Sequence, residues 1–402
     1  MNRSSPIKPD WYTHRDYSAI VLREYLRPIG GYDTPIFPPT FAMREKLQRT
    51  PYNIDTLKDG TNVCLIDSVP SQANRLEPIF DDYSDPRLVR QVNVNVTSGG
   101  GKNASMTVVN LLKVGHRVAD AIVRFSDKSD EIAIALREHE AGDSTKLAKD
   151  YATSIVFGAW NSRDAGEKVK RIVQSTIRAF DVDPLTRASQ YVPAYDYKAL
   201  LDEKDELVID MSKVKGKEKA ALDKKLSGQG LLAVPVTSMK TKQADKDLAF
   251  RVPGGVLVNG DIRRDASINL VNLRALRTGN SKDSNPETLR HYILSLSLMA
   301  LLYEQEYALR QECQLVLDPE RAERRFKEVK TKFGKHPLAL VKRDGTEERL
   351  ELKFETAKAE AQTAARKMNI DATELIIRFE AAKVRERLKG KAEDGESEEE
   401  QA

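Results

Sequence analysis

The sequence predicts a mixed α+β protein in which short strands and helices alternate along the chain. Residues 91–97 (QVNVNVT) alternate between polar and apolar side chains, which is typical of a half-buried strand. Residues 289–307 carry apolar side chains at helical spacing behind a capping box at Ser284–Glu287 and a proline. Hydrophobic residues make up 40% of the 402 residues, enough to bury a sizeable core.

The first half of the chain is expected to contain mainly strands and loops. Residues 1–60 are rich in proline, tyrosine and arginine, which predicts irregular structure with short strands. Hydrophobic patterning then predicts a strand at 63–67, a strand at 91–97, an amphipathic helix at 106–125, and further strands at 154–160 and 172–182.

The second half contains the strongest helix signal. Residues 254–276 predict a strand, a turn, a polar strand and a short helix. The helix that begins near Ser284 is apolar on nearly every side, so it should be buried. Asp344-Gly345 is a hairpin signal between two short strands. Asp371 is expected to cap a helix that runs to about Lys389.

Composition divides the chain into one main domain and two additions. Residues 1–317 are expected to form the main domain, interrupted by a charge-dense insertion at about 198–246. Residues 318–390 form a C-terminal extension with a hairpin and a helix. Residues 391–402 are acidic and have the composition of a disordered tail.

Several classes of protein are disfavoured. The net charge of +4 opposes a uniformly cationic binder, although it says nothing about local patches. The two cysteines lie far apart without a Cys/His cluster, which predicts reduced thiols and no zinc site. The loop at 98–103 (SGGGKN) lacks the first glycine and the magnesium-binding hydroxyl of a Walker motif. The longest uncharged apolar run, 292–303, is too short to span a bilayer, and no secretory signal precedes it, so a cytoplasmic protein is expected.

Candidate catalytic groups are few. None of the five histidines lies in a known nucleophile or metal motif. His116 remains as a candidate general acid or base. Asp261 and Asp265 could bind a metal ion, but the two arginines between them favour salt bridges.

Basic and polar side chains gather in four places, which indicates an RNA-binding surface. Arginine suits phosphate because its planar fork donates two hydrogen bonds at once. Two of the four places are stretches with a net charge of +3 each, 154–180 and 251–277. The other two are a single turn with Gln72, Asn74 and Arg75, and a predicted helix face with Arg117 and Arg124.

Six uncommon segments occur in a fixed order between residues 65 and 317. They are LIDSVPSQANRLEPIF (65–80), HRVADAIVR (116–124), SIVFGAWNSR (154–163), STIRAFDV (175–182), GDIRRDASINLVNLRAL (260–276) and LRQECQLVL (309–317). Together they resemble the backbone subunit of the type I-G (formerly I-U) CRISPR interference (Cascade) complex, a member of the RAMP superfamily. The resemblance covers most of residues 60–317.

The resemblance implies a ferredoxin-like, RRM-type core with large insertions that form a palm, a finger and a thumb. It also implies that copies of the subunit polymerise head-to-tail along the spacer part of the guide RNA (crRNA). Other Cascade subunits and the target DNA paired to the guide would be further partners in antiviral defence. No catalysis, cofactor or metal is implied. Contacts should go to phosphate and ribose, because a backbone subunit must ignore the guide sequence.

The expected RNA-binding residues follow from the matching segments and from local charge. The matching segments nominate Gln72, Asn74, Arg75, His116, Arg117, Arg124, Asn161, Arg163, Arg263 and Arg264. Local charge adds Lys170, Arg171 and Arg178. An internal salt bridge, of Arg75 to Glu77 or of Arg264 to Asp265, is an equally weighted alternative.

Two further expectations concern this surface. Trp160 lies in an apolar segment and is expected in the core rather than stacked on a base. The alternative function is a RAMP-type endoribonuclease that processes or cleaves RNA through His116 or Asp261.

Overall fold

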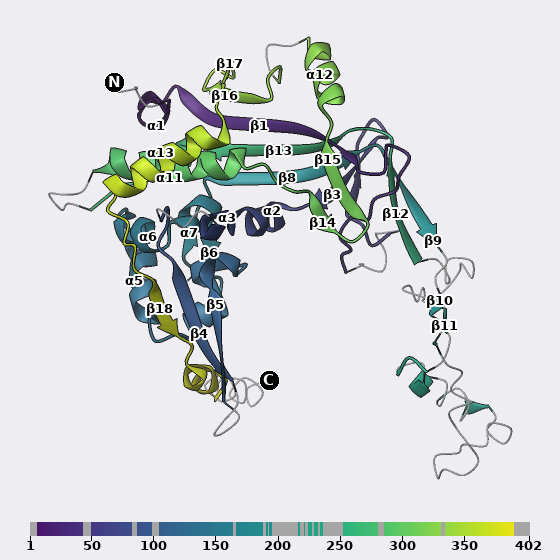
Figure 1. The fold of residues 1–402 in the computed structure, drawn as a ribbon, viewed down its shortest axis with the longest axis horizontal. Helices are drawn as coiled ribbons and strands as arrows, with labels where there is room; N and C mark the ends of the chain where they lie inside the picture. The colour runs from purple at the N-terminus through teal and green to yellow at the C-terminus, as the bar shows by residue number, and fades with distance from the viewer. Residues whose placement is uncertain are drawn as a thin grey trace, which may run out of the picture.

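The computed structural model describes residues 6–42, 50–82, 87–98, 104–163, 166–187, 252–279, 285–330 and 334–389, with short pieces between 190 and 235. In Figure 1 the long strands β1, β13 and β8 cross the upper part of the molecule, and a lower lobe contains α5 and β4. The loop at 99–103, most of the predicted insertion at 198–246 and the tail at 391–402 lie outside the described residues.

The main sheet has the strand order β14-β15-β1-β13-β8-β3-β2, and the hairpin β16–β17 pairs with β1. Along one edge of β1, β15 pairs with its last residues and β16 with its first. The strands are β1 (Tyr17–Pro28), β2 (Ile54–Thr56), β3 (Asn62–Asp67), β8 (Val173–Phe180), β13 (Ile262–Asn269), β14 (Ala308–Arg310), β15 (Cys313–Leu317), β16 (Leu338–Lys342) and β17 (Glu347–Arg349).

The centre of this sheet has the ferredoxin-like topology. β13 lies between β1 and β8 and is antiparallel to both, so β1 and β8 are parallel. In the same way β1 lies between β13 and β16 and is antiparallel to both. Helices connect β1 to β8 and β13 to β16, which completes two interleaved βαβ units. The predicted α+β class is therefore confirmed.

Helices cover one face of the sheet. They are α1 (Asp10–Thr13), α2 (Val69–Leu76), α10 (Leu270–Ala275), α11 (Pro286–Leu302) and α13 (Phe354–Lys367). The central helix α11 is buried on nearly all sides, as its uniform apolar pattern predicts. It contacts β8, β13 and α13, and the small residues Ala357, Ala361 and Ala364 of α13 are buried there.

The opposite face of the sheet is not covered by these helices. Along β13 the side chains of Ile262, Ala266 and Ile268 are buried on the helical side. Between them, Arg263 and Asp265 are half-buried and belong to the other face, because side chains alternate along a strand. This alternation places a row of polar residues on the exposed side of the core.

The lower lobe is a three-stranded sheet with helices packed beside it. β18 (Leu375–Arg378) pairs parallel with β4 (Val92–Ser98), which pairs antiparallel with β5 (Ser105–Asn110). The neighbouring helices are α3 (Ile79–Asp82), α4 (Ala121–Arg124), α5 (Ser129–Glu140), α6 (Thr145–Asp150) and α7 (Ala152–Phe157), with 3₁₀ turns at Leu111–Lys113 and Arg117–Ala119. The C-terminal extension thus returns to both parts of the structure, with α13 on α11 and β18 on β4.

A two-stranded ribbon extends from the other end of the sheet (Figure 1). It consists of β9 (Val182–Arg187) and β12 (Val252–Val258), so the predicted insertion lies between its two strands. The remaining elements are β6 (Ala159–Trp160), β7 (Lys168–Val169), β10 (Gln190–Tyr191), β11 (Val234–Pro235) and α12 (Pro319–Glu328). No helix in the described ranges is long and apolar enough to cross a membrane.

Most of the predicted elements are present, and four predictions were wrong. The segment 17–28 is one long strand rather than irregular structure, and 106–110 is a strand instead of the start of a helix. Residues 152–157 are a helix, although 154–160 was predicted to be a strand. The prediction failed because a fully buried segment has no hydrophobic periodicity that distinguishes a helix from a strand. Asp371 accepts a hydrogen bond from the Thr373 N–H in a turn, and β18 follows before a helix at 381–389.

Candidate nucleic-acid interface

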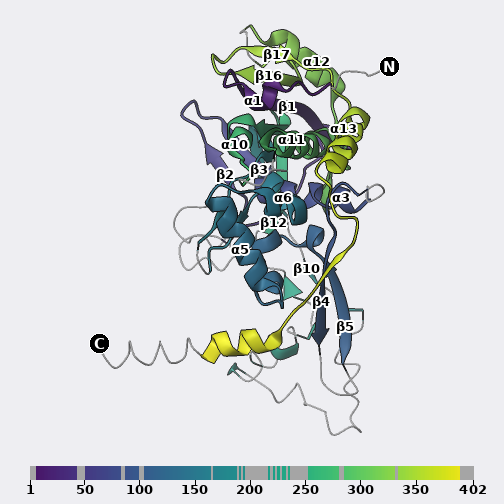
Figure 2. The same ribbon diagram turned by 90° about the vertical axis from the view of Figure 1, so that its left-hand side faces the viewer.

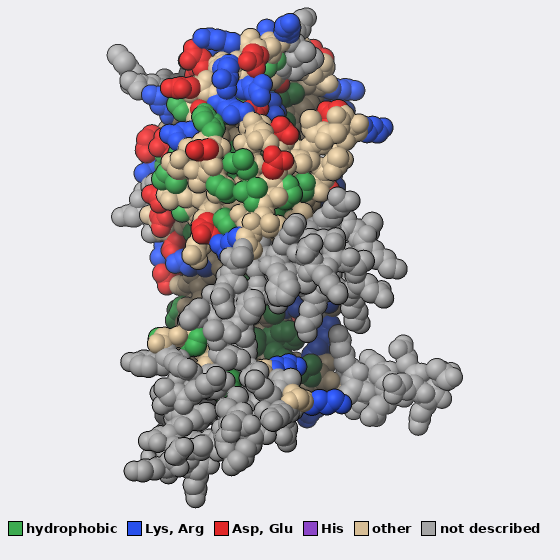
Figure 3. All heavy atoms as spheres, turned by 90° about the vertical axis from the view of Figure 1, so that its right-hand side faces the viewer, with side chains coloured by type: hydrophobic (Ala, Val, Ile, Leu, Met, Phe, Trp, Pro, Cys, Tyr) green, Lys and Arg blue, Asp and Glu red, His purple; other side chains and the backbone are tan. Residues whose placement is uncertain are grey.

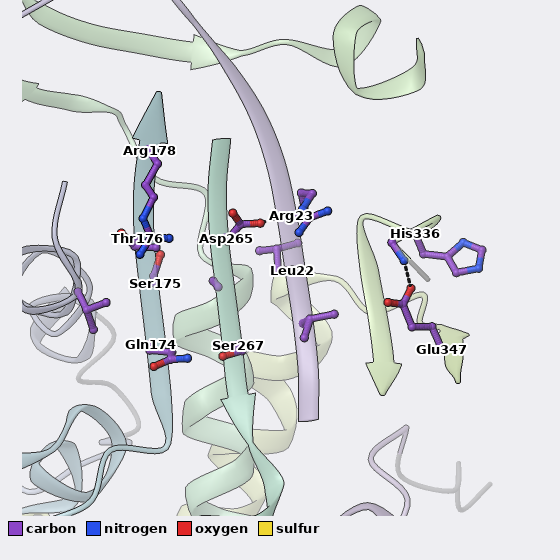
Figure 4. Close-up of a pocket in the computed structure, with 14 residues that line it drawn as sticks. Leu22, Arg23, Gln174, Ser175, Thr176, Arg178, Asp265, Ser267, His336 and Glu347 are labelled. Atoms are coloured by element: carbon purple, nitrogen blue, oxygen red, sulfur yellow. Dashed lines mark hydrogen bonds and ion pairs between the residues drawn. The ribbon is translucent and has the colours of Figure 1, made fainter. Parts of the chain in front are cut away.

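Three neighbouring strands place polar side chains in register on the open face of the sheet. Across β1, β13 and β8, Val21 lies beside Ser267, which lies beside Gln174. Two residues along, Arg23 pairs with Asp265, which pairs with Thr176. These residues line a shallow hollow of about 300 Å³, which Figure 4 shows together with His336 and Glu347 from beside β1. We call this surface the open face.

Arginines dominate the charge of the open face. The Asp265 carboxylate binds two of them, with 2.8 Å to Arg23 Nε and 2.7 Å to Arg263 Nε. The guanidinium of Arg263 also lies over the ring of Phe180, 4.7 Å from its centroid. Arg178 lies opposite Arg263 in the register, and its side chain makes no hydrogen bond or ion pair with any other described residue. Arg23, Arg178 and Arg263 outnumber the Asp265 and Glu347 carboxylates by one, which leaves a small net positive charge and one guanidinium, that of Arg178, available for an anion.

The helix α12 closes one end of the open face. Its Phe326 ring packs edge-on against Tyr25 of β1 at 5.7 Å. Arg321 and Arg325 of the same helix bind the Asp261 carboxylate at 2.5 and 3.0 Å. Figure 3 shows Lys and Arg side chains intermixed with acidic ones in the upper part of this end of the molecule. Asp261 is therefore neutralised by arginines, which disfavours it as a metal ligand.

Several predicted RNA-binding residues belong instead to a buried polar network beneath the sheet. Gln72 is fully buried; its Nε2 donates to Asp67 and its Oε1 accepts from the Ser175 hydroxyl. Arg264 is also fully buried and donates to Ser175 and, at 2.7 Å, to Glu24. Neither residue offers a surface to RNA, so both are removed from the candidate interface.

The two arginines with a salt-bridge alternative do form salt bridges, with partners that differ from those expected. Arg75 Nε lies 3.1 Å from the buried Asp67 carboxylate rather than beside Glu77. Arg264 pairs with Glu24 of the neighbouring strand rather than with Asp265. Asp265 points to the opposite face of β13, where it binds Arg263 and Arg23. Adjacent residues of a strand lie on opposite faces, which explains why Arg264 and Asp265 do not meet.

Arg117 is a second buried arginine and is held by Glu77. Its Nε lies 2.7 Å from Glu77 Oε2, and its guanidinium lies over the Phe157 ring. The residue adopts a positive φ of 54°, an uncommon backbone conformation for a side chain of this size. Burial raises the pKa of Glu77 to about 7, although the Arg117 charge opposes the shift. Arg117 therefore fixes the loop before α4 and does not face solvent.

This buried carboxylate predicts a pH-dependent stability. The pKa of Glu77 rises from 4.5 to about 7 on folding, so its stabilising contribution is complete below pH 4.5 and is lost as the pH rises through 7. Between pH 5 and pH 8 the wild type should lose about 2 kcal/mol more unfolding free energy than Glu77→Gln, at about 1.4 kcal/mol per pKa unit. Urea unfolding at both pH values measures this difference. An identical pH dependence in the two proteins would contradict it.

A second group of predicted residues lies on an exposed surface around β6 and β7, which we call the Trp160 surface. Trp160 is 61% exposed, so its predicted place in the core was wrong. The Lys168 ammonium lies 5.5 Å from the centre of its ring. The apolar segment is buried over 152–157. Trp160 follows on the two-residue strand β6, where its indole is exposed. The other exposed members are Asn74, His116, Arg163, Lys170 and Arg171.

Two predicted residues lie near the Trp160 surface but are partly or fully covered. The Asn161 side chain is buried and donates at 3.0 Å to Glu167 across the turn between β6 and β7. Arg124 is half-buried, with its guanidinium over the neighbouring Phe125 ring. Asn161 therefore shapes the turn rather than presenting a donor to a ligand.

The sequence reasoning missed Arg23, Gln174 and Ser267 of the open face. The signal for Arg23 was available, because residues 17–27 contain β-branched and aromatic side chains with no glycine or proline. Gln174 and Ser267 carry no charge, and only the register of β8 with β13 brings them together. Within the described ranges, no three His, Cys, Asp or Glu side chains are grouped as a metal ion would require.

Comparison with known families gives one match. Residues 20–184 match the model of a family described as CRISPR-associated protein GSU0053 (Cas_GSU0053). The match confirms the predicted resemblance to CRISPR-associated proteins over that range, which contains most of β1 together with β3, α2, β8 and the Trp160 surface. A search of curated proteins finds no match to the chain.

Proposed function

Residues 20–184 match a CRISPR-associated protein family, and from this match we propose that the chain is a guide-RNA-binding subunit of a type I-G CRISPR interference complex. The observation that carries the proposal is the open face, where Arg178 has no described partner and Asp265 orients two further arginines. Guanidinium groups suit this role because they bind phosphate oxygens in pairs.

The open face favours contacts to the RNA backbone over contacts to bases. Apart from the Asp265 and Glu347 carboxylates, its polar groups are guanidinium, imidazole, amide and hydroxyl groups, which bind phosphate and ribose oxygens of any sequence. The Trp160 surface adds an exposed ring on which any base can stack. Both features support binding without sequence specificity, as a subunit that accommodates many guides requires.

We further propose that copies of the chain assemble head-to-tail on one RNA strand. A heterologous contact that does not close into a ring produces an open filament. Modest affinity per copy is then sufficient, because neighbouring copies on a shared strand raise the effective concentration. Other subunits of the complex and target DNA would join this filament.

Copurification with RNA tests the proposal. The protein expressed with a repeat-spacer array should elute with bound RNA of defined length, in particles larger than one copy. Binding to three unrelated RNAs of equal length should differ by less than about threefold, because the phosphate contribution does not depend on sequence. Protein that elutes as a monomer without nucleic acid in the presence of the array would contradict the proposal.

We propose that this role is non-catalytic. His116 is an exposed residue that precedes a 3₁₀ turn and makes no side-chain capping bond, and Asp261 is bound by two arginines. Incubation of labelled RNA with and without magnesium distinguishes a binder from a ribonuclease. Specific cleavage that disappears in His116→Ala or Asp261→Ala would replace the binding role with the enzymatic alternative.

The Trp160 surface leads to a separate prediction. Trp160→Ala should weaken binding of single-stranded RNA by about 1–3 kcal/mol, the usual contribution of one base stacked on an aromatic ring. The unfolding free energy should change little, because the indole is 61% exposed. Fluorescence anisotropy and urea unfolding measure the two effects. Trp160→Phe is the control, since it keeps an aromatic ring, and a loss of affinity equal to that of the alanine variant would exclude stacking.

A further inference from the structure

Four arginines converge on a hollow of about 510 Å³ at the end of the core where β1 begins. They come from four parts of the chain: Arg15 precedes β1, Arg274 lies on α10, Arg290 on α11, and Arg343 follows β16. Figure 2 shows α1, α10, α11 and β16 close together at this end. We call this hollow the arginine pocket. It shares no lining residue with the open face.

The positive charge of the arginine pocket is not compensated by its lining. Among the described residues that line it, none is acidic, and the remaining polar groups are the hydroxyls of Ser18 and of Thr13, which already donates to the Pro9 carbonyl. Burial lowers the pKa of Arg290; Glu287 opposes this shift and Arg277 adds to it. The positive charges of neighbouring arginines repel one another, so an anion bound among them would be electrostatically favourable.

Arg274 is the member with the strongest demand for a ligand. Its Nη1 atom is buried and has no hydrogen-bond partner among the described residues. Burial lowers its pKa, and the charges of Arg290 and Arg15 lower it further. A guanidinium cannot lose its proton in a protein at neutral pH, so an anion bound in the hollow would compensate the charge of this half-buried group.

The chemistry of the pocket selects the anion. Planar guanidinium groups bind phosphate oxygens in bidentate fashion, and the Ser18 hydroxyl can donate a further hydrogen bond. Four positive charges favour a doubly charged group over the single charge of an internal phosphodiester. We propose that the arginine pocket binds a phosphate dianion, carried by a free nucleotide or by the terminal phosphate of an oligonucleotide.

Calorimetric titration with pyrophosphate at constant ionic strength tests the site. Arg274→Met and Arg290→Met should each weaken binding at least tenfold, whereas Arg137→Met, an exposed arginine on α5, should leave it unchanged. The double variant Arg15→Met with Arg343→Met removes two exposed members of the pocket and does not depend on replacing partly buried side chains. Pyrophosphate binding that is unchanged in all these variants would overturn the proposal.

Oligonucleotides and nucleotides identify the source of the phosphate. Tighter binding of a 5′-phosphorylated strand than of the same strand with a 5′-hydroxyl, lost in Arg274→Met, supports a strand end. Binding of ADP but not adenosine, with no preference between the two strands, supports a free nucleotide.

Equal dependence of both strands on Arg274 would overturn the dianion in favour of a phosphodiester. Displacement of pyrophosphate by a glutamate-rich peptide at equal affinity would overturn it in favour of an acidic protein segment. Arg178→Glu should not affect pyrophosphate, so this site and the RNA-binding role can fail separately.

Discussion

Arg264→Met is expected to lower the unfolding free energy by about 3–5 kcal/mol, the usual cost of removing one partner from a buried ion pair. The guanidinium of Arg264 is fully buried and joins three parts of the core. It donates to Glu24 on β1, to Ser175 on β8 and to the Leu301 carbonyl of α11. The variant leaves Glu24 with only the Tyr307 hydroxyl as a described side-chain donor. Urea unfolding monitored by circular dichroism measures the loss.

The neighbouring arginine of the same strand is the matched control. Arg263→Met removes a guanidinium that is partly exposed and paired on the open face, so it should cost less than about 1 kcal/mol. If Arg264→Met does not fold, Ser175→Ala removes two hydrogen bonds of the same network, one to Gln72 and one from Arg264, and should cost about 1–3 kcal/mol. Equal stability of the Arg263 and Arg264 variants would contradict the structural role assigned to Arg264.

Arg178→Ala is expected to weaken RNA binding about 10- to 100-fold, because a hydrogen bond to a charged group contributes about 1.5–3 kcal/mol. The effect should be similar for RNAs of different sequence. Its diagnostic sign is the salt dependence, since each lost phosphate contact should lower the slope of log K against log salt by about 1. Fluorescence anisotropy over a range of salt concentrations gives both quantities. The fold should be unaffected, because the Arg178 side chain makes no hydrogen bond or ion pair to another described residue.

Arg137→Ala on α5 is the control for non-specific loss of positive charge. This arginine is exposed and lies in the lower lobe, away from the open face (Figure 1). Its replacement should leave the salt slope unchanged. A similar loss of affinity in Arg137→Ala and Arg178→Ala would mean that RNA responds to overall charge rather than to the open face. A loss that varies strongly with RNA sequence would contradict recognition through the backbone.

Sequence reasoning was reliable for local features. The proline before α11, the hairpin signal at Asp344-Gly345 and the alternation in β4 each predicted an element that the structure contains, although Asn285 rather than Ser284 caps α11. It was unreliable for α7, where complete burial removes the alternation of polar and apolar residues. It was also unreliable for arginines, which can either be buried in an ion pair or exposed on a surface. Arg263 and Arg264 are adjacent in sequence, yet one is partly exposed on the open face and the other is fully buried.

The sequence by itself determined the α+β class, the resemblance to CRISPR-associated proteins and the concentration of arginines in a few segments. Only the tertiary structure decided which of those arginines can meet a ligand. The reason is physical: strand register and helix packing assign each side chain to the covered or the open side of a sheet. The pairing of β1 with β13 buries Arg264 against Glu24, and the same pairing leaves Arg23 and Arg263 beside Arg178 on the open face.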